Sequence, residues 1–354
     1  MSDRLSRLPH VVALFICLGL AFNARAKDPD TAVGELTKPI GPQFPNRVLE
    51  GHTGSVLWVT FTADGKTLAS SSRDDRVMIW DIASGKAIKT LTDPKDDVYC
   101  IAYSPDGKLL AGCSIDNRIY IWSVPSYELK QTLQQDAVLR NLSFSPDGKY
   151  IACGGYDKEV WIWNLASKEK TDQNKSKPMH TLTGYTGNIK AVEFSADGKL
   201  LVTGGMQPNV LIWGTDFSKK ASKQPLKVLE SPEKSYEAIT ISPDGKTVVG
   251  NSSHGPVIVW DVESGKILKT LTGHILEGDS LAYRADGKVL ASGNKDQTIT
   301  LWDTQTWEPK SVLTGNKGRI ESVTFSPDGK TLANGGGGGD TTIKLWDLSA
   351  FEIK

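Results

Sequence analysis

The sequence predicts an all-β fold, a seven-bladed β-propeller made of four-stranded antiparallel blades. The triplet Asp-Gly-Lys occurs seven times, and each copy precedes a tryptophan that ends a short β-rich run. The triplets begin at Asp64, Asp106, Asp147, Asp197, Asp244, Asp286 and Asp328, and the tryptophans are Trp80, Trp122, Trp163, Trp213, Trp260, Trp302 and Trp346. The offset is 16 residues in six units and 18 in the seventh, which contains five consecutive glycines. A period of roughly 40 to 50 residues with four short strands per unit is typical of propellers.

The first unit shows how each blade is expected to form. Residues 56–62 are expected to form the first strand, because they are rich in β-branched and aromatic side chains and alternate between apolar and polar from Val59 to Thr62, and the Asp-Gly-Lys turn leads into a second strand over residues 67–71. A second turn precedes the third strand, residues 77–81. The fourth strand is expected over residues 87–91, after Ser84-Gly85-Lys86.

Six units are followed by such a fourth strand, but the chain ends at Lys354, soon after the third strand of the seventh unit. The missing strand has a counterpart at the other end of the repeats, because Arg47-Val48-Leu49 has the same character and precedes the first unit. We expect this segment to complete the last blade and close the ring, which leaves no unpaired blade edge. Residues 47–354 are therefore predicted to form one domain.

The N-terminal residues differ from the repeats. Arg4 and Arg7 precede an apolar stretch from Val11 to Phe22, and Ala24-Arg25-Ala26 follows. This order is typical of a secretory signal peptide, so residues 1–26 are expected to be removed and the protein to be exported, either periplasmic or secreted. The alternative, a membrane anchor, would need about 20 apolar residues. Residues 27–46 contain four prolines and are predicted to be a linker.

Composition gives few indications of a charged partner. The chain has 41 Lys plus Arg and 41 Asp plus Glu, so its formal net charge is zero. No overall attraction to nucleic acid or to an anionic membrane is expected, and after signal cleavage we expect a monomeric ring without stable membrane insertion. Three cysteines would remain, Cys100, Cys113 and Cys153, each in a predicted strand. They are expected to be small buried side chains, although a bridge between Cys113 and Cys153 stays open.

Short motifs recur in register with the repeats. They are Gly-His at residues 51–52 and 273–274, Ser-Pro-Asp-Gly beginning at Ser104, Ser145, Ser242 and Ser326, and Trp-Asp at residues 80–81, 260–261, 302–303 and 346–347. Together they make residues 47–354 resemble the WD-repeat family, and with the export signal we expect an exported, bacterial-type member.

The resemblance implies a buried hydrogen-bonded tetrad of His, Ser or Thr, Asp and Trp in each blade. Two units have all four residues: His52, Ser70, Asp74 and Trp80 in the first, and His274, Ser292, Asp296 and Trp302 in the sixth. A buried aspartate needs such donors to be tolerated. His, Ser and Asp also form hydrolase triads, but an Asp in a tight turn and a Ser inside a strand favour a structural role. In the other units the set is incomplete.

The resemblance also implies a protein-binding face where the central channel opens. The matching positions in this chain are Leu57, Tyr99, Ile115, Val138, Arg140, Tyr156, Lys190, Met206, Glu237, Glu277, Asp279, Arg319 and Glu321, with Lys295 as a further cation. The apolar members come from the first four units, and the carboxylates come from units five to seven. We therefore expect a protein or peptide partner with an apolar anchor over blades one to four and a basic end over blades five to seven. The alternative is that some of these apolar side chains pack inward.

Motifs of enzymes are missing from the sequence. It contains no phosphate-binding loop, no His-Glu-x-x-His, no Cys-x-x-Cys and no Gly-x-Ser-x-Gly. The expected function is therefore a non-catalytic interaction scaffold that needs no cofactor and no metal. The alternative is an exported propeller enzyme, hydrolase-like or lyase-like, or a small-ligand binder. It would use Glu237, Glu277 and Asp279 at the channel mouth, and a divalent cation would be its expected cofactor.

Overall fold

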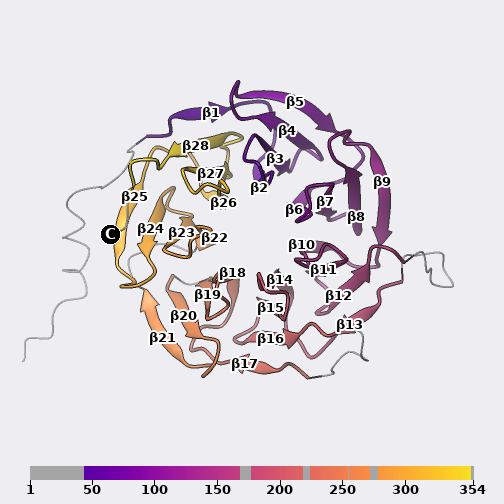
Figure 1. Cartoon of the computed structure of the whole chain (residues 1–354), viewed down its shortest axis with the longest axis vertical. Helices are drawn as coiled ribbons and strands as arrows, with labels where there is room; N and C mark the ends of the chain where they lie inside the picture. Colours follow the sequence, from indigo (N-terminus) through magenta and orange to yellow (C-terminus); the bar gives the residue numbers. More distant parts are fainter. Residues whose placement is uncertain (1–43, 168–176, 218–223, 254, 272–277, 352–354) are drawn as a thin grey trace, which may run out of the picture. The chain divides into compact units, whose positions relative to one another are not determined.

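The computed structural model describes residues 44–167, 177–217, 224–253, 255–271 and 278–351. These residues contain 28 strands in seven four-stranded antiparallel sheets, arranged as blades around a central axis (Figure 1). The predicted fold class is confirmed. The predicted signal peptide and most of the predicted linker lie outside the described residues.

Each blade begins with an inner strand next to the axis and ends with an outer strand at the rim (Figure 1). Blades one to three are β2 (Val56–Phe61), β3 (Thr67–Ser72), β4 (Val77–Asp81) and β5 (Lys86–Leu91); β6 (Val98–Tyr103), β7 (Leu109–Ser114), β8 (Arg118–Ser123) and β9 (Leu129–Gln134); β10 (Leu139–Phe144), β11 (Tyr150–Gly155), β12 (Val160–Asn164) and β13 (His180–Leu182). Blades four and five are β14 (Ile189–Phe194), β15 (Leu200–Gly205), β16 (Val210–Gly214) and β17 (Lys227–Leu229); β18 (Tyr236–Ile241), β19 (Thr247–Ser252), β20 (Val257–Asp261) and β21 (Ile267–Leu271). Blades six and seven are β22 (Gly278–Tyr283), β23 (Val289–Asn294), β24 (Ile299–Asp303) and β25 (Pro309–Leu313); β26 (Ile320–Phe325), β27 (Thr331–Gly336), β28 (Ile343–Asp347) and β1 (Arg47–Leu49).

The last blade takes its outer strand from the N-terminal side of the repeats, as the sequence predicts. β1 pairs antiparallel with β28, in the register Arg47 to Leu345, Val48 to Lys344 and Leu49 to Ile343. Leu49 is buried in the core between blades seven and one. The Arg47 guanidinium donates to the backbone carbonyls of Ile82 and Ala83 in blade one. The seam is therefore held both by strand pairing and by a side chain that reaches the next blade.

The core lies between neighbouring blades. Each repeat tryptophan is almost completely buried and packs against the blade before it: Trp80 shares a cluster with Leu345 of blade seven, and Trp122 shares one with Ile79 of blade one. Burying an indole between two sheets removes a large apolar area from water. The regularly spaced tryptophans of the sequence therefore mark the interfaces between blades that hold the ring together.

All three cysteines of the described residues are free and buried. Cys100 and Cys113 are directly opposite each other on β6 and β7, and all three pack in the same core cluster. They behave as small apolar side chains there.

Candidate functional site

The tetrad residues of blade one form a continuous hydrogen-bonded chain. His52 Nδ1 lies 2.8 Å from Asp74 Oδ2, and His52 Nε2 lies 2.7 Å from Ser70 Oγ. Ser70 Oγ also accepts a hydrogen bond of 2.8 Å from Trp80 Nε1. Burial opposes ionisation of Asp74, but the hydrogen bond and charge of His52 outweigh it and hold its pKa below the usual range. Because His52 and Ser70 are buried, this arrangement ties a loop to the blade rather than presenting a nucleophile.

Blade six shows the same arrangement in part. Trp302 Nε1 donates to Ser292 Oγ at 2.8 Å, and Asp296 Oδ1 accepts from the backbone and hydroxyl of Thr298. The fourth member, His274, lies outside the described residues. Trp213 Nε1 of blade four donates to Thr203 Oγ1, and Tyr185 Oη, 2.8 Å from that hydroxyl, takes the place of the histidine.

Other residue types satisfy the indoles of three further blades. Trp346 Nε1 donates to Asn334 Oδ1, whose amide donates to Asn316, while Trp122 Nε1 donates to Asp93 Oδ2 and Trp260 Nε1 to the Glu230 carbonyl. Sequence reasoning missed these acceptors because none belongs to the His, Ser or Thr pattern. Asp93, Glu230 and Asn316 share a position, since all three precede the inner strand of their own blade, whereas Asn334, the acceptor for Trp346, lies on β27.

Blade three differs from the others. Trp163 Nε1 is buried and has no hydrogen-bond partner among the described residues. Ser70, Thr203 and Ser292, the acceptors in blades one, four and six, stand ten residues before their tryptophans, and Cys153 occupies that place here. A sulfur atom is a poor acceptor for an indole N–H.

We predict that Cys153→Ser stabilises the protein by about 1 kcal/mol, because the new hydroxyl supplies Trp163 Nε1 with an acceptor. Denaturant unfolding of the variant beside the parent chain measures the change. Cys113→Ser is the matched control. It also buries a hydroxyl, but the indole of its blade already has Asp93 as acceptor, so this change is expected to destabilise. Equal losses for both variants would contradict the prediction.

The inner strands share a distortion at the end where the channel opens. In all seven inner strands the pairing skips the second residue, which is therefore bulged. These bulge residues are Leu57, Tyr99, Arg140, Lys190, Glu237, Asp279 and Glu321. β-Bulges commonly redirect a side chain next to a functional site. All seven line one cavity of about 250 Å³, which we call the channel mouth; Trp58, Arg73, Asn141, Lys295 and Arg319 complete its lining.

The structure brings most, but not all, of the predicted face together at the channel mouth. Tyr156 and Met206 are 43% and 51% exposed and lie outside its lining, as do the half-buried Ile115 and Val138. The expectation of an exposed side chain fails for Leu57, which is only 4% exposed. For this residue the alternative stated above holds, that the apolar side chain packs inward. Glu277 lies outside the described residues.

The carboxylates of the channel mouth each lie near a cation. Lys190 bonds to both oxygens of Glu237, which also accepts from Ser253. The Arg319 guanidinium donates to Glu321 at 2.7 Å. Burial alone would raise the pKa of Glu237, but the hydrogen bond and charge of Lys190 keep it below its usual range. The acidic half expected over blades five to seven exists, but its charge is largely neutralised within the protein.

Asp279 is held less tightly than Glu237 and Glu321. Its nearest cation is Lys295, at 4.0 Å, and its Oδ2 is buried without a hydrogen-bond partner among the described residues. Burial raises the pKa of Asp279 to about 6; the charge of Lys295 opposes the rise, and Glu321 and Glu237 add to it. Such a displaced pKa is commoner at functional sites than elsewhere.

Cations outnumber carboxylates in the lining of the channel mouth. The cations are Arg73, Arg140, Lys190, Lys295 and Arg319, against Glu237, Asp279 and Glu321. Arg140 lies over the Tyr99 ring, with its guanidinium carbon 4.6 Å from the ring centre. Within the described part of the chain, neither Arg73 nor Arg140 forms an ion pair with a carboxylate. The field of the channel mouth therefore favours an anionic group.

The channel continues below the mouth as a cavity of about 400 Å³ with hydroxyl and amide groups in its wall. One ionisable group stands out there, Glu193 on β14, whose Oε1 accepts from Thr240 at 3.4 Å. Burial raises the pKa of Glu193 to about 8, although the hydrogen bonds from Thr240 and the Ile241 backbone oppose it. Sequence reasoning missed this residue because an alternating strand does not show which face lines the channel.

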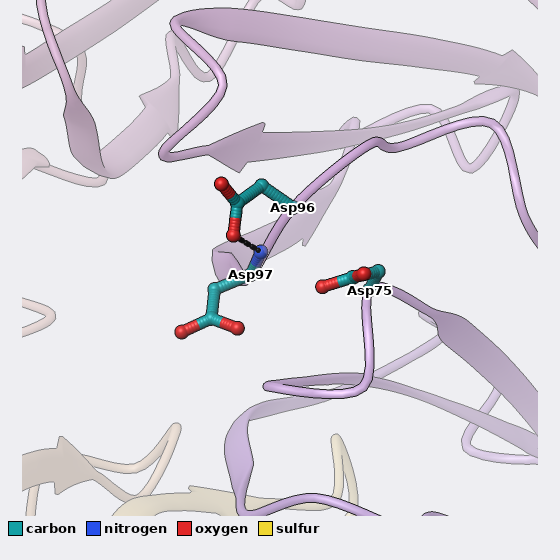
Figure 2. A group of neighbouring side chains, drawn as sticks. All are labelled: Asp75, Asp96 and Asp97. Atoms are coloured by element: carbon teal, nitrogen blue, oxygen red, sulfur yellow. Dashed lines mark hydrogen bonds between the residues drawn. The ribbon is translucent and has the colours of Figure 1, made fainter.

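A second feature that the sequence did not indicate lies on the turns of blades one and two. The carboxylates of Asp75, Asp96 and Asp97 come within 4.8 Å of one another (Figure 2). Burial and the charges of neighbouring aspartates raise the pKa of Asp75, and burial raises that of Asp97 against the charge of Arg73. Asp75 and Asp96 are exposed to solvent, so the cluster adds negative charge to the surface of these turns and does not form an enclosed site.

No helix in the described parts of the chain is long and apolar enough to cross a membrane.

Comparison with known proteins identifies the repeats. The family model "WD domain, G-beta repeat" matches residues 43–81, 85–123, 127–164, 176–214, 265–303 and 307–347, more than half of the chain. The vegetative incompatibility protein HET-E-1 of Podospora anserina is 56% identical over 39 residues, 11% of this chain and 3% of that protein. A ribosome biogenesis protein BOP1 homolog of Drosophila virilis is 37% identical over 95 residues, 24% of this chain and 12% of that protein. The chain thus spans only a small part of either relative.

Proposed function

This chain belongs to the WD-repeat family, and we propose that it is a non-catalytic scaffold that binds a protein or peptide partner at the channel mouth. Propellers of this family generally mediate protein interactions. The observation that carries the proposal is the ring of seven bulged residues, which places aromatic, cationic and acidic side chains around one opening. Interfaces of this kind combine an aromatic or arginine anchor with charges that orient the partner.

Export is a second part of the proposal, and it rests on the sequence alone. The basic residues, the apolar stretch and Ala24-Arg25-Ala26 favour a bacterial-type secretory signal. We propose a monomeric, exported ring that meets its partner in the periplasm or outside the cell. N-terminal sequencing of the protein recovered from culture fractions tests this, because a mature chain that begins at Lys27 is the expected result.

Partner capture tests the binding site. We predict that the purified chain retains a partner from an extract of its own cells, and that Tyr99→Ala with Arg140→Ala loses it, because these two side chains form the stacked anchor at the mouth. The control is Lys108→Ala with Lys149→Ala, on turns at the opposite ends of β6 and β10. Mass spectrometry of the retained proteins gives the readout. A partner held equally by the parent, the control and the mouth variant would contradict binding at the channel mouth.

The alternative is a propeller enzyme or small-ligand binder that uses the carboxylates of the mouth. Of its three proposed residues, Glu237 is bonded to Lys190 and Glu277 lies outside the described residues, which leaves Asp279. The cavity of about 400 Å³ below the mouth has room for a small polar molecule. A chain that captures no protein partner would favour this alternative.

A further inference from the structure

Two arginines give the channel mouth a positive charge that the ion pairs within it do not neutralise. Arg73, on the turn after β3, and Arg140, on the bulge of β10, line the same cavity. The carboxylates of that cavity lie beside other cations: Glu237 beside Lys190, Glu321 beside Arg319 and Asp279 beside Lys295. Among the described residues neither arginine forms an ion pair, although the charge of Arg73 acts on Asp97 and that of Arg140 on Glu237. The positive charge left over from the ion pairs of the mouth therefore belongs to these two side chains.

Arg140 is also held in a defined position. Its guanidinium stacks on Tyr99, the bulge residue of the neighbouring blade, and Nη1 approaches Tyr156 Oη at 3.5 Å. A guanidinium that is fixed by stacking keeps its planar set of donors available for a bidentate contact with a carboxylate. Less side-chain entropy is then lost when an anion binds.

The size of the mouth limits what can enter. A cavity of about 250 Å³ accepts one or two side chains rather than a folded element. Glu237, Asp279 and Glu321 line the same cavity and would repel a doubly charged anion more strongly than a singly charged one. An extended segment that carries singly charged acidic side chains meets both conditions.

Building on the protein-binding role above, we propose that the segment accepted by the channel mouth is acidic, an extended peptide of the partner whose Asp or Glu side chains contact Arg140 and Arg73. This assignment reverses the polarity expected from the sequence, which placed a basic end of the partner over blades five to seven. The reversal follows from the ion pairs, because the carboxylates of those blades are already occupied by Lys190 and Arg319. A basic residue of the partner would instead meet carboxylates outside the mouth, on the turns that carry Asp75, Asp96 and Asp97.

Three pools of fluorescein-labelled pentapeptides test the proposal with the purified full chain. Positions two and four are Glu in the first pool, Gln in the second and Lys in the third, and the other positions are randomised. Fluorescence anisotropy is expected to show the Glu pool binding about tenfold more tightly than the Gln pool, since one charge-assisted hydrogen bond contributes that much. The preference should weaken as the salt concentration rises.

Variants locate the effect. Arg140→Gln is expected to reduce binding of the Glu pool about tenfold and to leave the Gln pool unchanged. Lys149→Gln removes the same charge from the opposite end of β10 and is expected to change neither. Equal binding of the Glu and Gln pools by the parent chain overturns the proposal, as does a Glu preference that survives Arg140→Gln together with Arg73→Gln. Stronger binding of the Lys pool also overturns it and restores the polarity expected from the sequence.

The dependence of binding on pH gives a second readout. Burial and the charges of Glu321 and Glu237, opposed by those of Lys295 and Arg319, raise the pKa of Asp279 to about 6. Lowering the pH from 7.5 to 5.5 therefore removes most of one negative charge from the mouth. The Glu pool should then bind several-fold more tightly, while its own carboxylates stay ionised. Asp279→Asn should abolish this dependence, and an unchanged pH profile would contradict the role of Asp279.

The proposed function and this inference fail separately. If the mouth variant loses its captured partner but the Glu pool has no advantage, the scaffold role stands and the acidic specificity is rejected. If partner capture does not depend on Tyr99 and Arg140, the binding site itself is rejected, whatever the peptide pools show.

Discussion

Removal of β1 is expected to open the ring and to destabilise the whole propeller. A chain that lacks residues 1–49 loses the three pairs with β28 and the buried Leu49 side chain, together with the Arg47 contacts to blade one. Leu49→Ala alone should cost about 2 to 5 kcal/mol, as a truncated core leucine usually does. The deletion should cost more, and β28 would become an exposed edge that promotes association.

The control is a chain that lacks only residues 1–43, because it keeps β1. We expect it to unfold at the same denaturant concentration as the full chain, whereas the shorter chain unfolds earlier and elutes partly as oligomers. A synthetic peptide of residues 44–50 should restore stability to the shorter chain, and the same peptide with Leu49→Asp should not. If both truncated chains unfold at the same denaturant concentration, β1 does not close the ring.

The repeats could be predicted from the sequence because each strand and turn is encoded locally. The Asp-Gly-Lys turn requires a positive φ at glycine, which the structure shows at Gly65 and its equivalents. The buried tryptophans mark the interfaces between neighbouring blades. Closure by β1 followed because the seventh unit lacked a fourth strand, and the family model independently supports the repeat assignment.

The chemistry of the channel mouth could be predicted only in part. Positions near the mouth follow from the repeat, but the partners there come from different blades: Lys190 and Glu237 are 47 residues apart and meet because β14 and β18 are neighbours. A residue type does not reveal such a pairing, nor that Tyr185 replaces a histidine. For the same reason the acidic cluster of Asp75, Asp96 and Asp97 appeared only in three dimensions.

The second large effect concerns Glu193, whose replacement by glutamine is expected to stabilise the protein. Burial in the channel raises the pKa of Glu193 from 4.5 to about 8, so the folded state holds a proton that the unfolded state releases. Stability should therefore fall as the pH rises from 4.5 to 8 and stay level above that. Allowing for the partial exposure of Glu193, the cost is about 3 kcal/mol at pH 7.5, at roughly 1.4 kcal/mol per pKa unit.

Denaturant unfolding at pH 5.5, 7.5 and 9 measures this cost. Glu193→Gln should gain about 3 kcal/mol over the parent at pH 7.5. The gain should shrink to about 1 kcal/mol at pH 5.5, because that pH lies only about one unit above the ordinary pKa at which the unfolded chain takes up the same proton. Glu50→Gln, an exposed position before the first inner strand, is the control and should leave the pH profile unchanged. A gain for Glu193→Gln that is the same at all three pH values would show that packing, not ionisation, is the cause. A gain that follows the pH would mean that the fold keeps an acid in its channel at the expense of stability, which favours a role for Glu193 in what the channel admits.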